Sequence, residues 1–146
     1  MNIHVGLIQI NVTSVHAAWD FYVDTLGFTE APGSDRNTVL ILENGAGPKI
    51  LVYPVENSVT PGYPDQTGTT LVFYVEDIAT TVEEWQSRGV EFIPISWSED
   101  ETGIAGCPFG RFIAFRDPFG NIHEVLQPHA SMRVEEATIA AGESGS

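Results

Sequence analysis

The chain has 146 residues, 42% of them hydrophobic, and a formal net charge of −14 at pH 7. This length fits one domain or two tightly fused modules, and the apolar fraction is enough for a core. The large negative charge opposes phosphate backbones and anionic lipid surfaces, which argues against nucleic acid and membrane partners. No apolar run approaches the roughly 18 residues needed to cross a bilayer. Because Cys107 is the only cysteine and no basic-then-apolar leader opens the sequence, we expect a cytoplasmic protein without an internal disulfide.

The first half of the chain predicts a strand, a helix and three more strands. In order, these are a strand over 5–12, a helix over roughly 15–26, and strands over 28–31, 38–42 and 49–55. Ser14 is suited to cap the start of the helix, and Gly27 to end it. The strand assignments follow from β-branched content and from turn residues between the segments.

The second half predicts the same order after a linker over 56–67. The predicted elements are a strand over 69–75, a helix over 78–88, and strands over 90–95, 111–115 and 122–127. Asp77 is suited to cap the helix, and Gly89 to end it. The stretch 97–110 is predicted to be a loop, and 117–121 a turn.

The two halves are also related residue by residue. The positions Val12, Val15, Trp19 and Tyr22 are matched 63 residues later by Val75, Ile78, Val82 and Trp85. We therefore predict an α+β fold of two tandem βαβββ modules, 1–60 and 61–130, followed by a flexible C-terminal tail over 131–146. Neighbouring strands are expected to pair mostly antiparallel in a curved mixed sheet. The helices would cover one face and leave the other as an open cup, where a ligand could bind.

Three sequence segments resemble the vicinal oxygen chelate superfamily, which includes glyoxalase I, bleomycin-resistance proteins and extradiol dioxygenases. These segments are Phe21-Tyr22-Val23-Asp24-Thr25-Leu26-Gly27-Phe28, Val75-Glu76-Asp77-Ile78, and Phe115-Arg116-Asp117-Pro118-Phe119-Gly120-Asn121-Ile122-His123-Glu124. The resemblance covers about residues 3–128. It is specific for the superfamily and not for one reaction within it. It implies the cup, and it implies a homodimer, since a second subunit often completes such cups.

The resemblance further implies four cup positions that hold His, Gln or Glu in metal-dependent members. In this chain they fall on Leu7, Lys49 (within one residue), Thr70 and Glu124. Only Glu124 is a metal-ligand type, and ions such as zinc or iron require several convergent donors. We therefore predict no metal site and no cofactor, with a divalent metal as the alternative.

The histidines do not supply the missing donors. By strand alternation, His4 and His123 should face away from the cup. His16 begins a helix on the covered side, and His129 lies beyond the last strand.

Strand alternation also selects the side chains that would line the cup. Gln9 and Asn11 share the face of Leu7 and could supply hydrogen bonds. Tyr53 and Tyr74 have cup-facing parity in their strands, and Phe112 has the parity of Glu124. The predicted ligand-binding set is Leu7, Gln9, Asn11, Lys49, Tyr53, Thr70, Tyr74, Phe112 and Glu124. The alternative is that the tyrosines only pack the sheet.

Specific functional roles can be proposed for two charged residues, Glu124 and Lys49. Glu124 could be a remnant metal ligand, a general base, or a solvated strand residue. Lys49, the only lysine, could replace the metal by pairing with Glu124 or with an anionic ligand. The alternative is an exposed lysine at the start of a strand.

Three classes of function follow. The first is a metal-free protein that binds and sequesters a small molecule, for which aromatic compounds are the candidates. We favour this class because only one of the four positions carries a metal-ligand type of residue. The second is a metal-dependent lyase, isomerase or dioxygenase. The third is a metal-free enzyme that uses Glu124 as its catalytic general base.

Overall fold

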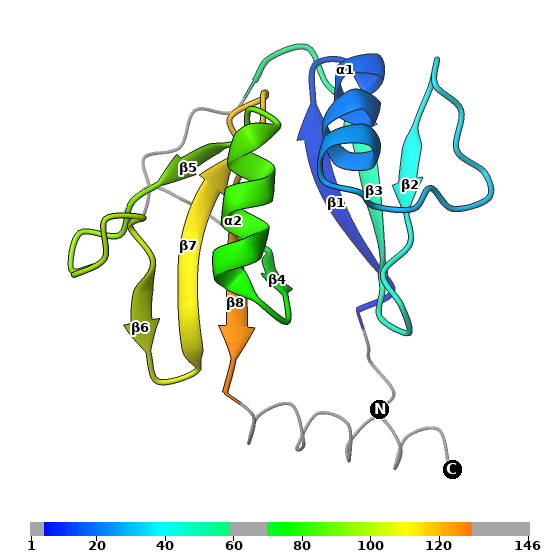
Figure 1. Ribbon diagram of the computed structural model, residues 1–146. Helices are drawn as coiled ribbons and strands as arrows, with labels where there is room; N and C mark the ends of the chain where they lie inside the picture. The colour runs from blue at the N-terminus through cyan, green and yellow to red at the C-terminus, as the bar shows by residue number, and fades with distance from the viewer. Residues whose placement is uncertain (1–4, 59–69, 130–146) are drawn as a thin grey trace, which may run out of the picture. The chain divides into compact units, whose positions relative to one another are not determined.

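The computed structural model describes residues 5–58 and 70–129. It is an α+β protein with two open sheets (Figure 1). The described residues form two compact units. Unit 1 takes 5–58 together with Arg116–Ile122, and unit 2 takes 70–115 together with 123–129. The predicted tail, most of the predicted linker and His4 lie outside the described residues.

Unit 1 contains a small mixed sheet and one helical segment. Its elements are β1 (Leu7–Val12), α1 (Val15–Trp19), η1 (Asp20–Thr25), β2 (Leu40–Leu42) and β3 (Lys49–Pro54). The sheet order is β1-β3-β2, with β3 parallel to β1 and antiparallel to β2. The strand predicted over 28–31 is reduced to one bridge between Glu30 and Leu42.

The helical segment of unit 1 begins as predicted but changes its winding. Ser14 Oγ accepts the Ala17 N–H at 3.1 Å, which confirms the N-cap. After Trp19 the backbone becomes a π-helix, with the Leu26 N–H donating to the Phe21 carbonyl at 2.9 Å. The predicted single helix over 15–26 is therefore wrong in its second half. Short π-helical turns of this kind are frequently found at functional sites.

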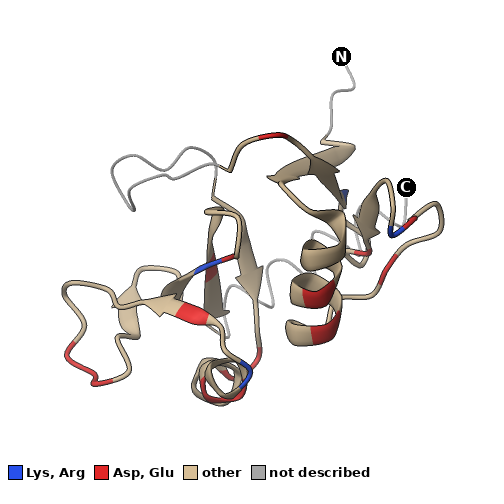
Figure 2. Cartoon of the chain, turned by 90° about the horizontal axis from the view of Figure 1, so that it is seen from above, with Lys and Arg blue, Asp and Glu red and all other residues tan. Residues whose placement is uncertain are grey.

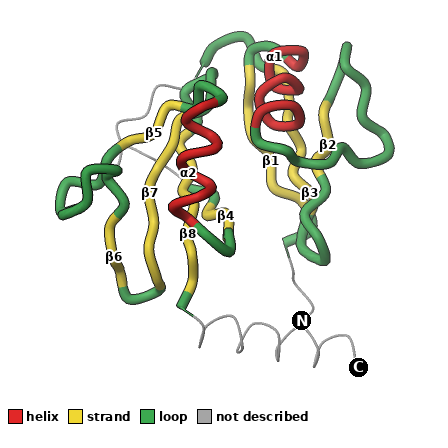
Figure 3. The backbone as a smooth tube through the Cα atoms, in the orientation of Figure 1, coloured by secondary structure: helices red, strands yellow, loops and turns green. Residues whose placement is uncertain are grey.

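Unit 2 contains the larger sheet. Its elements are β4 (Val72–Tyr74), α2 (Ile78–Ser87), β5 (Glu91–Ile93), β6 (Ala105–Cys107), β7 (Gly110–Arg116) and β8 (Ile122–Pro128). The sheet order is β4-β8-β7-β5, with β4 parallel to β8 and β6 paired antiparallel to β7. The prediction of a loop over the whole of 97–110 is therefore wrong at 105–107, where β6 forms. The sequence did not indicate this strand because Ala and Gly have low β-strand propensity. Figure 3 shows β6 separated from β5 by a long loop.

Helix α2 covers one face of the unit 2 sheet (Figure 1). Asp77 accepts the Thr80 N–H at 3.1 Å, which confirms the second predicted N-cap. Three residues that repeat the pattern of the first helix are buried on α2, namely Ile78, Val82 and Trp85. No helix among the described residues has the length and apolar character that a membrane span needs.

His123 lies in the core beneath α2, with 3% of its surface exposed. Its ring centroid is 5.4 Å from those of both Phe73 and Phe115. The prediction that His123 faces away from the cup is therefore confirmed. Burial lowers the pKa of His123 from 6.5 to about 4, so the ring is neutral in the folded protein.

This burial predicts a specific acid sensitivity. As pH falls from 6.5 to about 4, the unfolded chain binds a proton that folded His123 does not. The free energy of unfolding should therefore fall by roughly 3 kcal/mol over this range. Urea unfolding at pH 7.5 and pH 4 measures the loss, and His123→Leu should lose correspondingly less. The exposed His16→Gln is the control and should retain the wild-type loss; identical losses in all three proteins would contradict the assignment.

A buried carboxylate holds the turn between β7 and β8 within unit 1. Asp117 is 3% exposed and accepts the Tyr22 hydroxyl at 2.6 Å. It also accepts the backbone N–H groups of Phe119 and Asn121 at 2.9 and 2.8 Å. The Asn121 side-chain amide donates to Asp117 at 2.7 Å and to the Asn11 carbonyl at 2.8 Å. The sequence predicted the turn over 117–121, but nothing in the sequence predicted the hydrogen bond between Tyr22 and Asp117.

Removing the tyrosine hydroxyl should destabilise this turn. Burial raises the pKa of Asp117, and the hydrogen bond from Tyr22 opposes that rise. Tyr22→Phe therefore leaves a buried carboxylate with one donor fewer, and we expect the free energy of unfolding at pH 7 to fall by about 1–3 kcal/mol. The cost should shrink toward pH 4, because a protonated Asp117 needs fewer donors. Urea unfolding at both pH values tests this, with the exposed Tyr53→Phe as control; an equal effect of the two variants would refute it.

Candidate ligand-binding site

Unit 1 presents an open sheet face on the side away from its buried core. Ile10, Val12, Ile50 and Val52 are buried on one side of β1 and β3. The alternate residues form the unit 1 open face, which consists of Leu7, Gln9, Asn11, Lys49, Leu51 and Tyr53. Leu7 and Tyr53 are 50% and 48% exposed. Gln9 Nε2 donates to Asn11 Oδ1 at 2.8 Å, so the two predicted polar residues lie together on this face.

Lys49 has a carboxylate partner in its own unit. Its Nζ lies 2.8 Å from Glu43 Oε2, and both side chains are partly exposed. This geometry is that of a lysine at an exposed strand start, the alternative to its proposed role beside Glu124. An exposed pair of this kind contributes little to stability.

Unit 2 presents an equivalent open face on the side away from α2. Val72 and Tyr74 are 43% and 48% exposed and alternate with Phe73, which contacts His123 on the α2 side. In the parallel register, Val72 lies opposite Glu124 and Tyr74 lies opposite Leu126. The unit 2 open face therefore consists of Val72, Tyr74 and the half-buried Glu124, with Thr70 just before the strand.

Phe112 differs from this pattern because it is covered. It is 7% exposed, and its ring centroid is 5.9 Å from that of Trp97. Trp97 belongs to the loop between β5 and β6. Strand parity placed Phe112 correctly on the face of Glu124, but parity carries no information about a distant loop residue that covers it.

The strand registers correct one of the four positions implied by the resemblance. The N-caps Ser14 and Asp77 are 63 residues apart, and the same offset relates Gln9 to Val72. Gln9 pairs with Leu51, and Val72 pairs with Glu124. The unit 1 equivalent of Glu124 is therefore Leu51, two residues beyond the expected Lys49.

The corrected positions do not fit a divalent ion. Leu7 and Leu51 have no donor atom, Thr70 offers only a hydroxyl, and Glu124 alone is a strong ligand. Within residues 5–58 and 70–129, no three His, Cys, Asp or Glu side chains gather in a metal-binding arrangement. We therefore derive no metal-dependent step.

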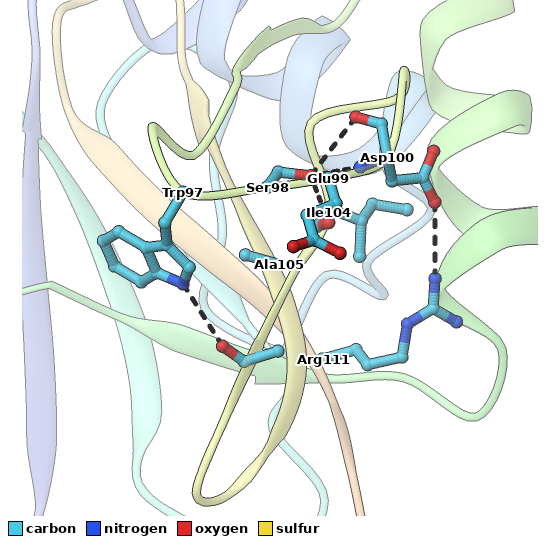
Figure 4. Close-up of a pocket in the computed structure, with 8 residues that line it drawn as sticks. Trp97, Ser98, Glu99, Asp100, Ile104, Ala105 and Arg111 are labelled. Carbon is cyan, nitrogen blue, oxygen red and sulfur yellow. Dashed lines mark hydrogen bonds and ion pairs between the residues drawn. The ribbon is translucent and has the colours of Figure 1, made fainter.

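A second concavity, the loop pocket, lies in unit 2 beside the loop between β5 and β6 (Figure 4). Its lining includes Trp97, Ser98, Glu99, Asp100, Gly106 and Arg111. Its volume is about 270 Å³. Sequence analysis did not predict this pocket, although a tryptophan close to three acidic residues in a predicted loop is a usable signal.

The fold and these faces place the chain in a known class. It matches the Glyoxalase/Bleomycin resistance protein/Dioxygenase superfamily over residues 4–125, and it belongs to this family. The resemblance drawn from the sequence motifs is thus confirmed.

Individual relatives agree with this assignment. The chain is 25% identical over 126 residues to the uncharacterized protein YetH of Bacillus subtilis (strain 168), covering 81% of this chain and 92% of YetH. It is similar in structure to TnmS3, an antibiotic binding protein from Streptomyces sp. CB03234, with a TM-score of 0.60 and 26% identity over 88% of this chain and 98% of TnmS3. The chain also shares its fold with the fosfomycin resistance protein FosX from Listeria monocytogenes, with a TM-score of 0.66 and 16% identity. This match covers 91% of this chain and 99% of FosX.

The exposure of the Lys49–Glu43 pair predicts that it contributes little to the free energy of unfolding. In a double-mutant cycle with Lys49→Gln and Glu43→Gln, we expect a coupling free energy below about 1 kcal/mol, because both charges are hydrated. Urea unfolding of the four proteins measures it. A coupling of several kcal/mol would show that Lys49 is held in a desolvated site, contrary to the exposed geometry.

Proposed function

We propose that this protein binds a small, flat, aromatic molecule without a metal and acts by sequestering it. The observation that carries the proposal is the exposure of Tyr53 and Tyr74, each about half exposed on a sheet face opposite the core. Tyr53 shares the unit 1 open face with the exposed Leu7, and Tyr74 shares the unit 2 open face with the exposed Val72. Exposed large apolar side chains that share a face usually mark a contact surface. Tyrosine combines a stacking ring with a hydroxyl, which suits recognition of aromatic molecules.

The neighbours of the tyrosines support the same function. On the unit 1 open face, Leu7 and Leu51 provide apolar surface, and Gln9 and Asn11 provide amide donors and acceptors. An aromatic ligand with one or two polar atoms needs this combination, whereas hydrolytic or redox chemistry needs metal ligands or paired acid and base groups.

The comparisons supply a precedent for binding. TnmS3, one of the similar solved structures, is described as an antibiotic binding protein. We extend this only to the class of activity: binding a small organic molecule in place of transforming it. Because Leu7 and Val72 are exposed on the open faces, we also propose that the protein is a homodimer whose second copy covers part of them.

A titration with Nile red, a neutral flat dye that fluoresces in apolar surroundings, tests the proposal. We expect saturable binding, weakened about fivefold by Tyr53→Ala or Tyr74→Ala, because each ring contributes stacking. Phe109→Leu removes an exposed aromatic residue from the turn between β6 and β7, outside both open faces and the lining of the loop pocket, and is the matched control. Unaltered affinity in both tyrosine variants would refute the proposed surface.

Metal analysis of protein purified without chelator separates the alternatives. We expect substoichiometric zinc, manganese, nickel and iron, and the same dye affinity before and after chelator treatment. A stoichiometric metal would instead establish the metal-dependent class. Turnover that is lost in Glu124→Gln, without any metal, would establish the general-base enzyme.

A further inference from the structure

The loop pocket lies outside the proposed binding faces and has a different character. None of the nine side chains predicted to bind ligand belongs to its lining. The pocket lies entirely within unit 2. It combines one large aromatic side chain with two carboxylates and one guanidinium.

Trp97 forms the aromatic wall and is fixed in place. Its indole N–H donates to the Gly106 carbonyl at 3.3 Å, and its ring packs against the Phe112 ring, with 5.9 Å between the centroids. It nevertheless remains 62% exposed. A ring held by two contacts while most of its surface faces solvent can receive a ligand with little loss of side-chain entropy.

The loop that carries Trp97 is also held in a defined conformation. The Ile95 N–H donates to the Gly103 carbonyl at 3.0 Å, and the Gly103 N–H donates to the Asp100 carbonyl at 3.0 Å. Gly103 has φ +85°, and a Cβ there would lie 2.8 Å from Pro94. Only glycine tolerates both this positive φ and this close approach of Pro94, so the sequence at Gly103 favours this loop conformation. The pocket is therefore preformed in the absence of a ligand.

The charges of the pocket leave one carboxylate without a counterion. Asp100 Oδ2 is 3.8 Å from Arg111, and its Oδ1 accepts the Thr102 N–H at 3.0 Å. Among the described residues, none forms a hydrogen bond or an ion pair with the Glu99 carboxylate. Figure 4 shows this carboxylate between the Trp97 indole at one end of the pocket and the Arg111–Asp100 pair at the other.

We propose that the loop pocket binds a small organic cation with a planar aromatic part. The ring would stack on Trp97, and Glu99 would neutralise the charge. Tryptophan is the aromatic residue that attracts cations most strongly. Arg111 does not make this an anion site, because Asp100 already pairs with it and the chain as a whole carries −14. The proposal rests on the loop pocket alone and does not depend on the proposed function of the open faces.

Two probes with the same three-ring aromatic system test whether the pocket prefers a positive charge. N-methylacridinium is a permanent flat cation, and acridine is neutral at pH 8. Isothermal titration calorimetry at an ionic strength of about 0.15 M, which screens long-range attraction, should show that wild type binds the cation about tenfold more tightly. Glu99→Gln should abolish this preference, and Trp97→Leu should weaken both probes about tenfold.

Glu101→Gln is the matched control, because it removes the same charge from the same loop but does not line the pocket. It should change either affinity by less than twofold. Equal effects of Glu99→Gln and Glu101→Gln would overturn the proposal in favour of diffuse attraction by the acidic surface. Unchanged binding in Trp97→Leu would also overturn it. Because Tyr74→Ala should weaken Nile red without changing the N-methylacridinium affinity, failure of one proposal is distinguishable from failure of the other.

Discussion

The structure depends on one buried carboxylate, that of Asp117. A carboxylate with 3% exposure survives in a protein only if donors surround it, and here two backbone N–H groups, an amide and a phenol do so. The phenol comes from Tyr22, 95 residues earlier in the chain. This bond makes the turn over Arg116–Ile122 part of unit 1, although the two strands that it joins, β7 and β8, lie mostly in unit 2.

Strand alternation then decides which side chains can meet a ligand. In unit 2 it directs Phe73 and His123 toward α2, where rings pack and the imidazole stays neutral. The neighbours of these residues, Val72 and Glu124, must face the other way. The acidic residues of the helical segments are Asp20, Asp24, Glu83 and Glu84, and all four are exposed (Figure 2 shows the red bands on the helices). These exposed helical positions add to the negative net charge, but they do not lie on the open sheet faces that strand alternation defines.

Local patterns of the sequence predicted local structure well and long-range structure poorly. The caps Ser14 and Asp77, and the faces of the long strands, follow from periodicity within about ten residues. The Tyr22–Asp117 bond and the cover of Trp97 over Phe112 join separate segments, and no local period encodes them. The equivalence of Glu124 with Leu51 was missed for a related reason. The first strands of the two modules are offset by 63 residues but the last strands by 73, so only the pairing registers reveal the match.

The equivalence of Leu51 with Glu124 changes how the four positions implied by the family resemblance are interpreted. With Leu51 in place of Lys49, two of the four positions are leucines on the face that carries Tyr53, and neither has a charge to desolvate. Under the proposed function, these leucines favour an aromatic ligand, because apolar surface is gained without stripping water from a donor. Such a face selects for shape and apolar area but hardly for charge, since Glu43 already neutralises Lys49. Discrimination between cations and neutral molecules requires a carboxylate beside an aromatic wall, and the loop pocket supplies that pair in Glu99 and Trp97.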